Sequence, residues 1–257
     1  MSRPRKSAAG GRCTPFVSKL QSSVLKFKQI GVRRPCPVAM AAEVLCTRWT
    51  VVLLRELVAG STRFNDLRRG VPKMSPTLLS QRLKELEVAG IVERREVTSE
   101  KGIFEYCLTE SGKDLRVVVE AVGFWGQKWV EARKSLKNLD PSLLMWDMRR
   151  NLNPTPLPNR KTVIQFMHPE LPVSKRSWWL VVETEGGVDL CWIDPGLNVD
   201  LYVSTDLRTM TSIWMGLTTV RKEGAKVILT GNREVAAKIQ VWLGLSPFAI
   251  EPKRVAA

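Results

Sequence analysis

Histidine is nearly missing from this chain of 257 residues, since it occurs only once, at position 168. The cysteines are scattered and form no CxxC pair: Cys13, Cys36, Cys46, Cys107 and Cys191. One histidine without paired cysteines argues against a zinc site. An odd number of scattered cysteines also fits a reducing cytoplasm better than a disulfide framework, so we expect a cytoplasmic protein.

Catalytic motifs are missing as well. The sequence contains no nucleophile elbow, no phosphate-binding loop and no metal-binding pattern. Its single histidine, His168, lies in MHPE at the end of an expected strand, where a structural or solvent-facing role is favoured over that of a general base. We therefore expect neither an enzyme nor a bound metal or cofactor.

Long apolar runs are also absent. None reaches the ~18 residues typical of a transmembrane helix, so no membrane span is expected. The start, MSRPRKSAAGGR, lacks the apolar core of a secretory signal. Its basic, acid-free composition also describes an organellar transit peptide, or a start site assigned too far upstream.

Positive charge is abundant but uneven: 40 basic and 25 acidic residues give a net charge of +15. Residues 1–34 hold nine Lys and Arg and no acid, residues 35–139 hold 17 against 13, and residues 140–257 hold 14 against 12. We expect residues 1–34 to be a solvated, disordered extension, with an arm that binds phosphates as the alternative.

Residues 75–89, SPTLLSQRLKELEVA, predict a short helix with two different faces. Ser75 suits the N-cap, Pro76 the first helical position, and Gly90 the point where a helix stops. Leucines at helical spacing would face a core: Leu79, Leu83 and Leu86. The other side would present side chains that hydrogen-bond bases or phosphates: Thr77, Ser80, Gln81 and Lys84.

The neighbouring segments complete a winged helix-turn-helix pattern. Two helical stretches, residues 47–59 and 63–69, and the turn GVPKM precede this helix. A strand, a polar turn and a second strand follow it as IVERREV, TSEKG and IFEYCLT. This order is typical of a winged helix, whereas an amphipathic helix beside an unrelated hairpin is the plainer alternative.

Several motifs in order resemble the HxlR family of bacterial winged-helix regulators: CPVAMAAEVLCTRWTVVLLREL, RFNDLRRGVPKMSPTLLSQRLKELEVAGIVERR and YCLTESGKDL. The resemblance covers about residues 35–136 and argues against a transit peptide. It implies a homodimer that binds double-stranded DNA and regulates transcription. The operator of a two-fold dimer is expected to be an inverted repeat. The expected DNA contacts are Arg63, Ser75, Thr77, Ser80, Gln81, Lys84, Arg94, Arg95 and Lys101.

A long helix is expected from the cap at Thr109 to about Leu136. Its apolar residues follow spacings of three and four and form a seam suited to pairing with another helix: Leu115, Val118, Val122, Trp125, Trp129, Ala132 and Leu136. The resemblance favours homodimerisation through this seam over packing against its own domain. Gly123 and Gly126 predict a kink or a close approach.

The spacing of the apolar residues changes after residue 139, from mostly helical to mostly strand-like. A short helix is expected after Asp140. A linker or turn is expected next, because three prolines follow: Pro154, Pro156 and Pro158. Strands are expected at KTVIQFMHP, SWWLVVET, VDLCWID, VDLYVST and AKVILTG, and helices at residues 206–216 and 233–243. Strands with packed helices indicate an α+β domain.

Parts of this second half resemble the sterol-carrier-protein type of lipid-binding domain: WWLVVE, VDLCWIDPG, VDLYVSTD, IWMG and VILTGN. The resemblance implies an apolar tunnel between sheet and helices. The residues expected to line it are Trp178, Trp192, Met210, Trp214, Met215 and Trp242. A stripe of Trp and Met is also typical of an ordinary core, and that alternative stays open.

Cys36, in RRPCPVA, is the one candidate for a reactive thiol. Arg33, Arg34 and the start of a helix would favour its thiolate. The family resemblance adds that some HxlR-type regulators sense oxidants or electrophiles through a cysteine at this place. A small residue that fits the helix entry is the alternative. Cys46 is expected to be buried and inert on an apolar helix face.

These patterns predict an α+β chain in three parts. Residues 1–34 form the extension, residues 35–138 a winged helix with a dimerisation helix, and residues 139–257 a sterol-carrier-like ligand-binding domain. The favoured function is a transcriptional regulator controlled by an apolar ligand or by Cys36 oxidation. A lipid carrier with an accessory DNA-binding domain is the alternative, and an acyl-transfer enzyme is a distant third.

Overall fold

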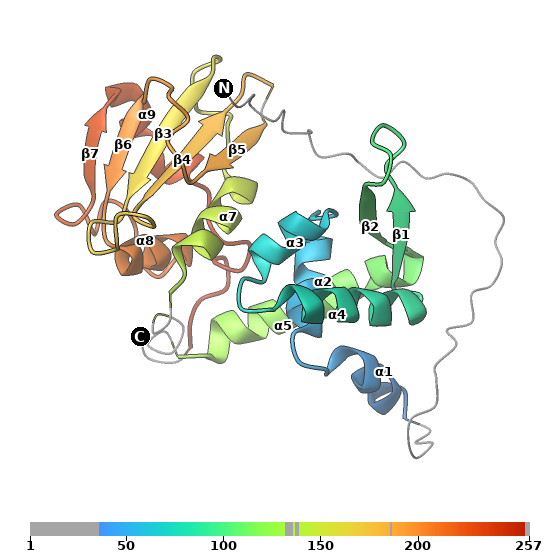
Figure 1. Ribbon diagram of the computed structural model, residues 1–257. Helices are drawn as coiled ribbons and strands as arrows, with labels where there is room; N and C mark the ends of the chain where they lie inside the picture. The colour runs from blue at the N-terminus through green and yellow to red at the C-terminus, as the bar shows by residue number, and fades with distance from the viewer. Residues whose placement is uncertain (1–35, 132–135, 137–138, 186, 255–257) are drawn as a thin grey trace. The chain divides into compact units, whose positions relative to one another are not determined.

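The computed structural model describes residues 36–131, 136, 139–185 and 187–254 (Figure 1). The chain divides into two compact units between Val122 and Gly123, inside a single helix, α5 (Glu110–Trp129). The predicted N-terminal extension, residues 1–34, lies outside the described residues. The predicted domain boundary near residue 139 stays a prediction.

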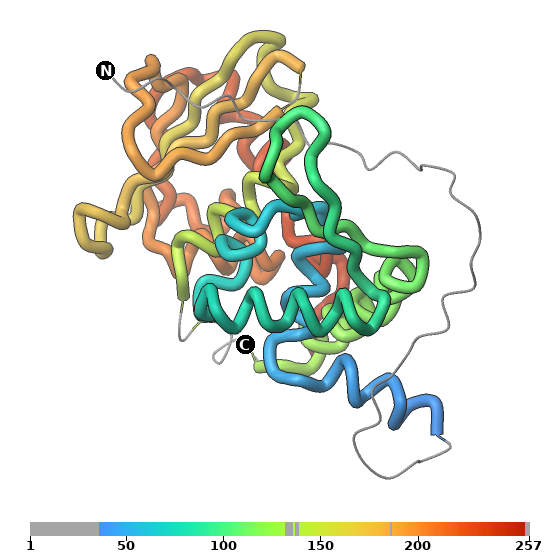
Figure 2. Tube along the Cα trace, turned by 45° about the vertical axis from the view of Figure 1, so that its right-hand side comes forward, coloured from blue at the N-terminus to red at the C-terminus, as the bar shows by residue number. Residues whose placement is uncertain are grey.

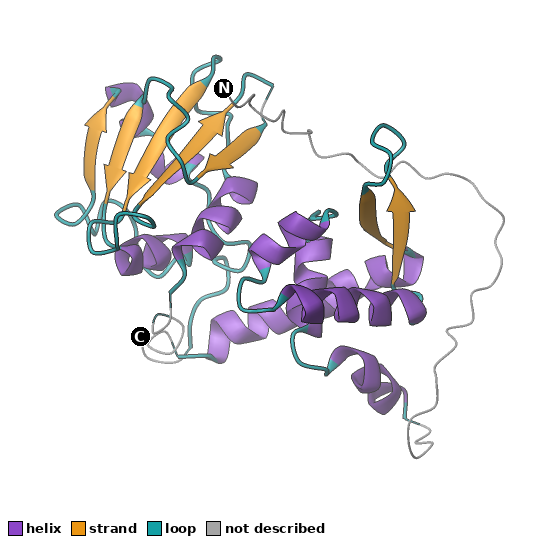
Figure 3. Ribbon diagram, in the orientation of Figure 1, coloured by secondary structure: helices purple, strands orange, loops and turns teal. Residues whose placement is uncertain are grey.

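The N-terminal unit has the order of a winged helix-turn-helix, as predicted. Its helices are α1 (Pro37–Leu45), α2 (Thr50–Val58), α3 (Phe64–Gly70), α4 (Pro76–Val88) and the first part of α5. The strands β1 (Val92–Glu96) and β2 (Phe104–Leu108) form an antiparallel hairpin, seen beside the helices in Figure 3. In Figure 2 the chain leaves α4 (teal) and enters this hairpin (green).

Leucines from successive helices form the core of this unit and so hold the helices together. Leu53 of α2, Leu67 of α3 and Leu79 of α4 are fully buried in one cluster. Local caps fix the ends of the helices. The Gly112 N–H donates to the Thr109 hydroxyl (3.2 Å), which confirms the predicted cap of α5.

Three local expectations in this half are wrong. The helix predicted from Thr47 begins at Thr50, because Trp49 takes a left-handed backbone conformation (φ 77°). The long helix ends at Trp129 rather than near Leu136, which lies in a turn. Cys46 is exposed rather than buried, because it follows the last turn of α1 as its C-cap.

The C-terminal unit has an α+β fold, in which helices pack against one five-stranded sheet. The strands are β3 (Thr162–Met167), β4 (Ser177–Val182), β5 (Val188–Cys191), β6 (Leu201–Ser204) and β7 (Ile228–Gly231). They lie in the order β5-β4-β3-β6-β7, visible in Figure 1. β3 and β6 run parallel and the other neighbours antiparallel. All five predicted strands are confirmed.

The helices of this unit are α7 (Pro141–Asn151), α8 (Leu207–Trp214), α9 (Arg233–Ala237) and α10 (Ile239–Trp242). The helix predicted over residues 233–243 is interrupted at Lys238. The helices bury the main core against one face of the sheet, where Met145, Phe166 and Trp242 are fully inaccessible. A smaller cluster of Val163, Trp179 and Val181 lies on the other face, as expected from side-chain alternation.

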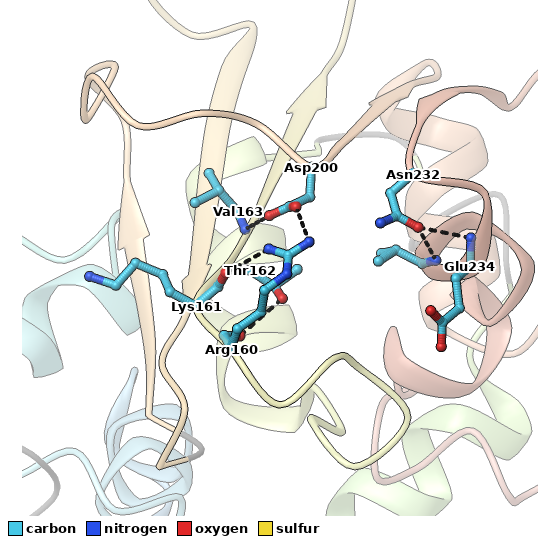
Figure 4. Close-up of polar contacts among 8 residues, drawn as sticks. Arg160, Lys161, Thr162, Val163, Asp200, Asn232 and Glu234 are labelled. Carbon is cyan, nitrogen blue, oxygen red and sulfur yellow. Dashed lines mark hydrogen bonds and ion pairs between the residues drawn. The ribbon is translucent and has the colours of Figure 1, made fainter.

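Asp200 joins the starts of β3 and β6 (Figure 4). Its carboxylate accepts from the Val163 N–H (2.9 Å) and from Arg160 Nη2 (2.7 Å). The Asn232 N–H donates to the Asp200 carbonyl (2.8 Å), and the Asn232 side chain caps α9 by accepting from the Glu234 N–H (2.9 Å). These bonds tie β3, β6 and α9 together, so this polar cluster stabilises the sheet.

Candidate nucleic-acid interface

Helix α4 separates its apolar and polar residues onto two faces. Leu79, Leu83 and Leu86 are at most 2% exposed and lie in the core. The Ser75 hydroxyl accepts from the Leu78 N–H (3.2 Å) and so serves as the N-cap. The predicted DNA-contact residues of the helix are all exposed: Thr77, Ser80, Gln81 and Lys84. Each can therefore reach a ligand outside the unit.

An acidic residue organises this exposed face. Gln81 Nε2 donates to Glu85 Oε1 (3.0 Å), and Arg82 pairs with the same carboxylate. Arg82 Nε also donates to the Arg48 carbonyl (3.3 Å), which links α4 to the turn before α2. Glu85 is not among the predicted site residues, although its spacing of four from Gln81 is the signal for such a pair.

The hairpin carries basic side chains that are held in different ways. Arg94 lies over the Phe104 ring (3.7 Å to its centroid), and Arg95 pairs with Glu93. Lys101 is exposed in the turn between the strands. The Gly102 N–H donates to Glu96 Oε1 (2.8 Å), which fixes the base of that turn. Basic side chains are thus placed on a defined wing.

Arg63, a predicted DNA contact, is paired with two acidic residues of the wing. Its Nη2 donates to Glu100 Oε1 (2.7 Å), and its Nε lies 3.6 Å from Glu105 Oε1. The hydrogen bond to Glu100 raises the pKa of the Arg63 guanidinium, and the charge of Glu105 adds to this effect. The Tyr106 N–H also donates to the Thr62 carbonyl (2.8 Å). Arg63 therefore anchors the wing to the start of α3.

The predicted dimerisation residues on α5 divide into two groups. Leu115 packs against the core of its own unit, together with the buried Val119. The other four follow one another along the helix at spacings of four, three and four and are exposed by 44–62%: Val118, Val122, Trp125 and Trp129. We refer to these four residues as the α5 stripe.

Cys36 and Cys46 mark the two ends of α1, and both are exposed. Cys36 is the N-cap residue, and its side chain makes no capping hydrogen bond. The nine-residue helix between the two cysteines places their Cα atoms, ten residue steps apart, at a separation of roughly 15 Å. A disulfide requires Cα atoms within roughly 7 Å, so these cysteines cannot pair within one folded chain.

The residues predicted to line an apolar pocket are mostly in the core between sheet and helices. Trp178, Met210 and Trp214 are buried there, with Met215 partly buried at its edge and Trp242 inaccessible. Trp192 lies outside this core and is 51% exposed, because it follows the end of the short strand β5. Five of the six residues thus lie in this core or at its edge, and their lining of a ligand pocket stays a prediction.

The described part of the chain contains no group of three or more His, Cys, Asp or Glu side chains arranged to hold a metal ion. No single described helix has the length and apolar composition to cross a membrane, although α1 and α2 together, bent by 84°, meet these two criteria.

Comparisons with known proteins address the N-terminal half. Residues 44–134 match the family of HxlR-like helix-turn-helix domains. The uncharacterized HTH-type transcriptional regulator YvaP of Bacillus subtilis (strain 168) is 34% identical over 97 residues, which are 37% of this chain and 90% of YvaP. A second such regulator of that strain, YdeP, is 34% identical over 94 residues, 37% of this chain and 73% of YdeP.

The solved structure of the redox regulator HypR in its reduced form is 34% identical with a TM-score of 0.34, and the match covers 36% of this chain and 91% of that one. The family match ends at residue 134, before α7. Because the identity to YvaP extends over nearly all of that protein, this chain belongs to the HxlR family of helix-turn-helix proteins.

Proposed function

We propose that this chain is a DNA-binding transcriptional regulator that acts as a homodimer. The observation that carries the proposal is the exposed polar face of α4 within an HxlR-type domain. A helix that buries its leucines and presents Thr77, Ser80, Gln81 and Lys84 has the chemistry needed to enter a major groove. YvaP and YdeP are both named as transcriptional regulators.

The proposed contacts have separate tasks. Gln81 reads a base, with adenine as the usual partner of glutamine. Arg94, Arg95 and Lys101 on the wing bind phosphates and supply affinity that does not depend on sequence. Arg63 is a positioning residue, since its bonds to Glu100 and Glu105 hold the wing.

The α5 stripe supports the proposed homodimer. Large apolar side chains that are half exposed along one helix face are typical of a surface that a partner covers. A second copy of α5 fits because its stripe is the same. Two copies related by a two-fold axis would read an inverted repeat with half-sites one helical turn, or a multiple of it, apart.

The C-terminal unit is proposed to hold an apolar effector, in keeping with the sterol-carrier-type resemblance. In support, residues 123–129 of α5 make their contacts with this unit. Gln127 Nε2 donates to the Met215 carbonyl (3.1 Å), and Lys128 pairs with Glu251 (2.7 Å). The rest of α5 packs in the winged helix, so one helix belongs to both units. An effector alters DNA binding only if it favours one arrangement of that helix.

Cys36 is proposed as a second point of control. Its exposure and its place at the N-terminus of α1 support a reactive thiol. A change at this cysteine would act on the entry to α1, whose residues Val38 and Met40 are exposed apolar side chains.

The test is the selection of bound sequences from a random duplex pool by the full chain at ~150 mM salt, where phosphate contacts alone do not dominate. An enriched inverted repeat is expected. Salt-sensitive binding without enrichment would contradict the proposal and favour the alternative, a lipid carrier with an accessory DNA-binding domain. Lipid transfer between vesicles would then be the activity to measure.

A further inference from the structure

His168 and Thr205 are neighbours at the carboxyl ends of the parallel strands β3 and β6. Each follows the last residue of its strand, and those last residues, Met167 and Ser204, pair in register. The Thr205 N–H donates to the Met167 carbonyl (3.0 Å), so the pairing continues past the strands. Because side chains alternate, both residues extend the rows that face the helices.

Both side chains are buried, and each has an unused polar atom. His168 is 0% and Thr205 3% exposed. His168 Nδ1 lies 2.9 Å from the Thr205 carbonyl oxygen, which can only accept, so Nδ1 carries the proton. Nε2 is then an acceptor. Neither His168 Nε2 nor the Thr205 hydroxyl has a hydrogen-bond partner among the described residues.

The charges nearby show which ligands this pair suits. Burial lowers the pKa of His168, although the Thr205 carbonyl and the charges of Glu170 and Asp206 act in the opposite direction. A neutral ring whose Nε2 has no proton cannot donate to a carboxylate. The two acids are already engaged, Glu170 by the Leu207 N–H (2.7 Å) and Asp206 by the Thr209 N–H (2.8 Å). The position therefore suits a neutral group.

We propose that His168 and Thr205 bind the hydroxyl group of a small apolar molecule. A hydroxyl can both donate to Nε2 and accept from the Thr205 hydroxyl, so it has the chemistry that both buried atoms lack. The apolar part of the molecule would lie among the core residues between sheet and helices, which include Trp178 and Leu207. The inference rests on the proposed effector role of this unit and names the class of effector.

The probes are octan-1-ol and 1-methoxyheptane, which have similar size. The ether can accept from Thr205 but cannot donate to Nε2. The full chain is labelled with ¹⁵N-histidine, and its single histidine gives one imidazole spectrum. Octan-1-ol is expected to bind about tenfold more tightly than the ether, since the ether leaves Nε2 buried without a partner. It is also expected to move the Nε2 resonance toward that of a hydrogen-bonded acceptor.

Two variants locate the effect. Thr205→Val keeps the shape and removes the hydroxyl, and His168→Asn keeps a donor near the place of Nδ1 and removes Nε2. His168→Asn is expected to abolish the preference for the alcohol, because it removes the acceptor that only the alcohol can satisfy. Thr205→Val is expected to weaken the binding of both probes and to keep the preference, because both accept from the Thr205 hydroxyl. Equal binding of both probes, or binding of neither, would overturn the proposal. An Nε2 resonance already typical of a hydrogen-bonded acceptor and unmoved by octan-1-ol would also overturn it, because an internal water then fills the role. Operator selection is independent of these results, so the two proposals fail separately.

Discussion

The ring of Phe248 lies so close to the backbone of Gly123 that a Cβ at position 123 would stand 2.3 Å from Phe248 Cε1. The same ring meets Phe124 edge-on, with centroids 5.4 Å apart. Gly123 is thus required for a close approach between α5 and the C-terminal segment. The sequence predicts either a kink or a close approach at Gly123. The structure shows the close approach, and α5 continues through this glycine.

Gly123→Ala is therefore expected to destabilise the chain by about 1–3 kcal/mol, because the ring must move out of a packed position. The free energy of unfolding in urea measures this. Gly126→Ala is the matched control, since a Cβ there meets nothing within 4 Å in the described structure. It should instead stabilise α5 by up to ~1 kcal/mol through helix propensity. Equal effects of the two substitutions would contradict the assignment.

Gln81→Ala is expected to weaken binding by about 1–3 kcal/mol at one base position and to relax specificity there. The reason is the loss of a paired contact to a base edge, and binding to operators with each substituted base measures it. An equal loss on every sequence would make Gln81 a positioning residue. Arg95→Ala is the comparison: it should weaken all sites alike and reduce the dependence on salt concentration.

The DNA-reading half could be predicted largely from sequence because its signals are local. The N-cap Ser75, the leucines of α4 and the order of elements each depend on spacing within a few residues. Contacts between distant segments had no such signal. The ion pairs of Arg63 are an example, since its partners Glu100 and Glu105 lie far along the chain.

In the second half, strands and helices followed from composition, but the surroundings of single residues did not. The alternation of β3 places His168 on the inward face, yet burial depends on helices that pack there only in three dimensions. Trp192 carries the same apolar signal as Trp178 but follows a four-residue strand and is exposed. Tertiary position, rather than residue type, separates these two tryptophans.

Stability is expected to depend on pH through His168. Burial lowers its pKa in the folded chain from the ordinary value of 6.5. As the pH falls below about 6.5, the unfolded chain takes up a proton that the folded chain refuses, so the free energy of unfolding decreases, by at most about 1.4 kcal/mol per pH unit. Urea unfolding from pH 7.5 to 5.5 measures this, and His168→Asn should remove the dependence. An unchanged dependence in that variant would assign it to other groups.

Cys36→Ser is expected to leave operator binding intact and to remove any response to oxidant. The serine keeps the size of the side chain at the N-cap of α1 but cannot be oxidised like a thiol. Gel-shift titrations with and without diamide compare the two proteins. Cys46→Ser, the change at the other exposed end of α1, is the control and should keep the response. Release of the Cys36→Ser variant from DNA by oxidant would exclude Cys36 as the sensor.

If the chain forms the proposed homodimer, Trp125→Glu is expected to yield a monomer, because Trp125 is 62% exposed at the centre of the α5 stripe. Each copy loses the burial of one large apolar side chain, worth roughly 1.5–3 kcal/mol. The two copies together therefore weaken association about a hundred- to ten-thousandfold, and the charges in the interface add to this. Sedimentation equilibrium measures the association. Trp192→Glu replaces a similarly exposed tryptophan of the C-terminal unit and should leave the dimer unchanged. If both variants stay dimeric, another surface joins the two copies, and the spacing of operator half-sites has to be explained from that surface.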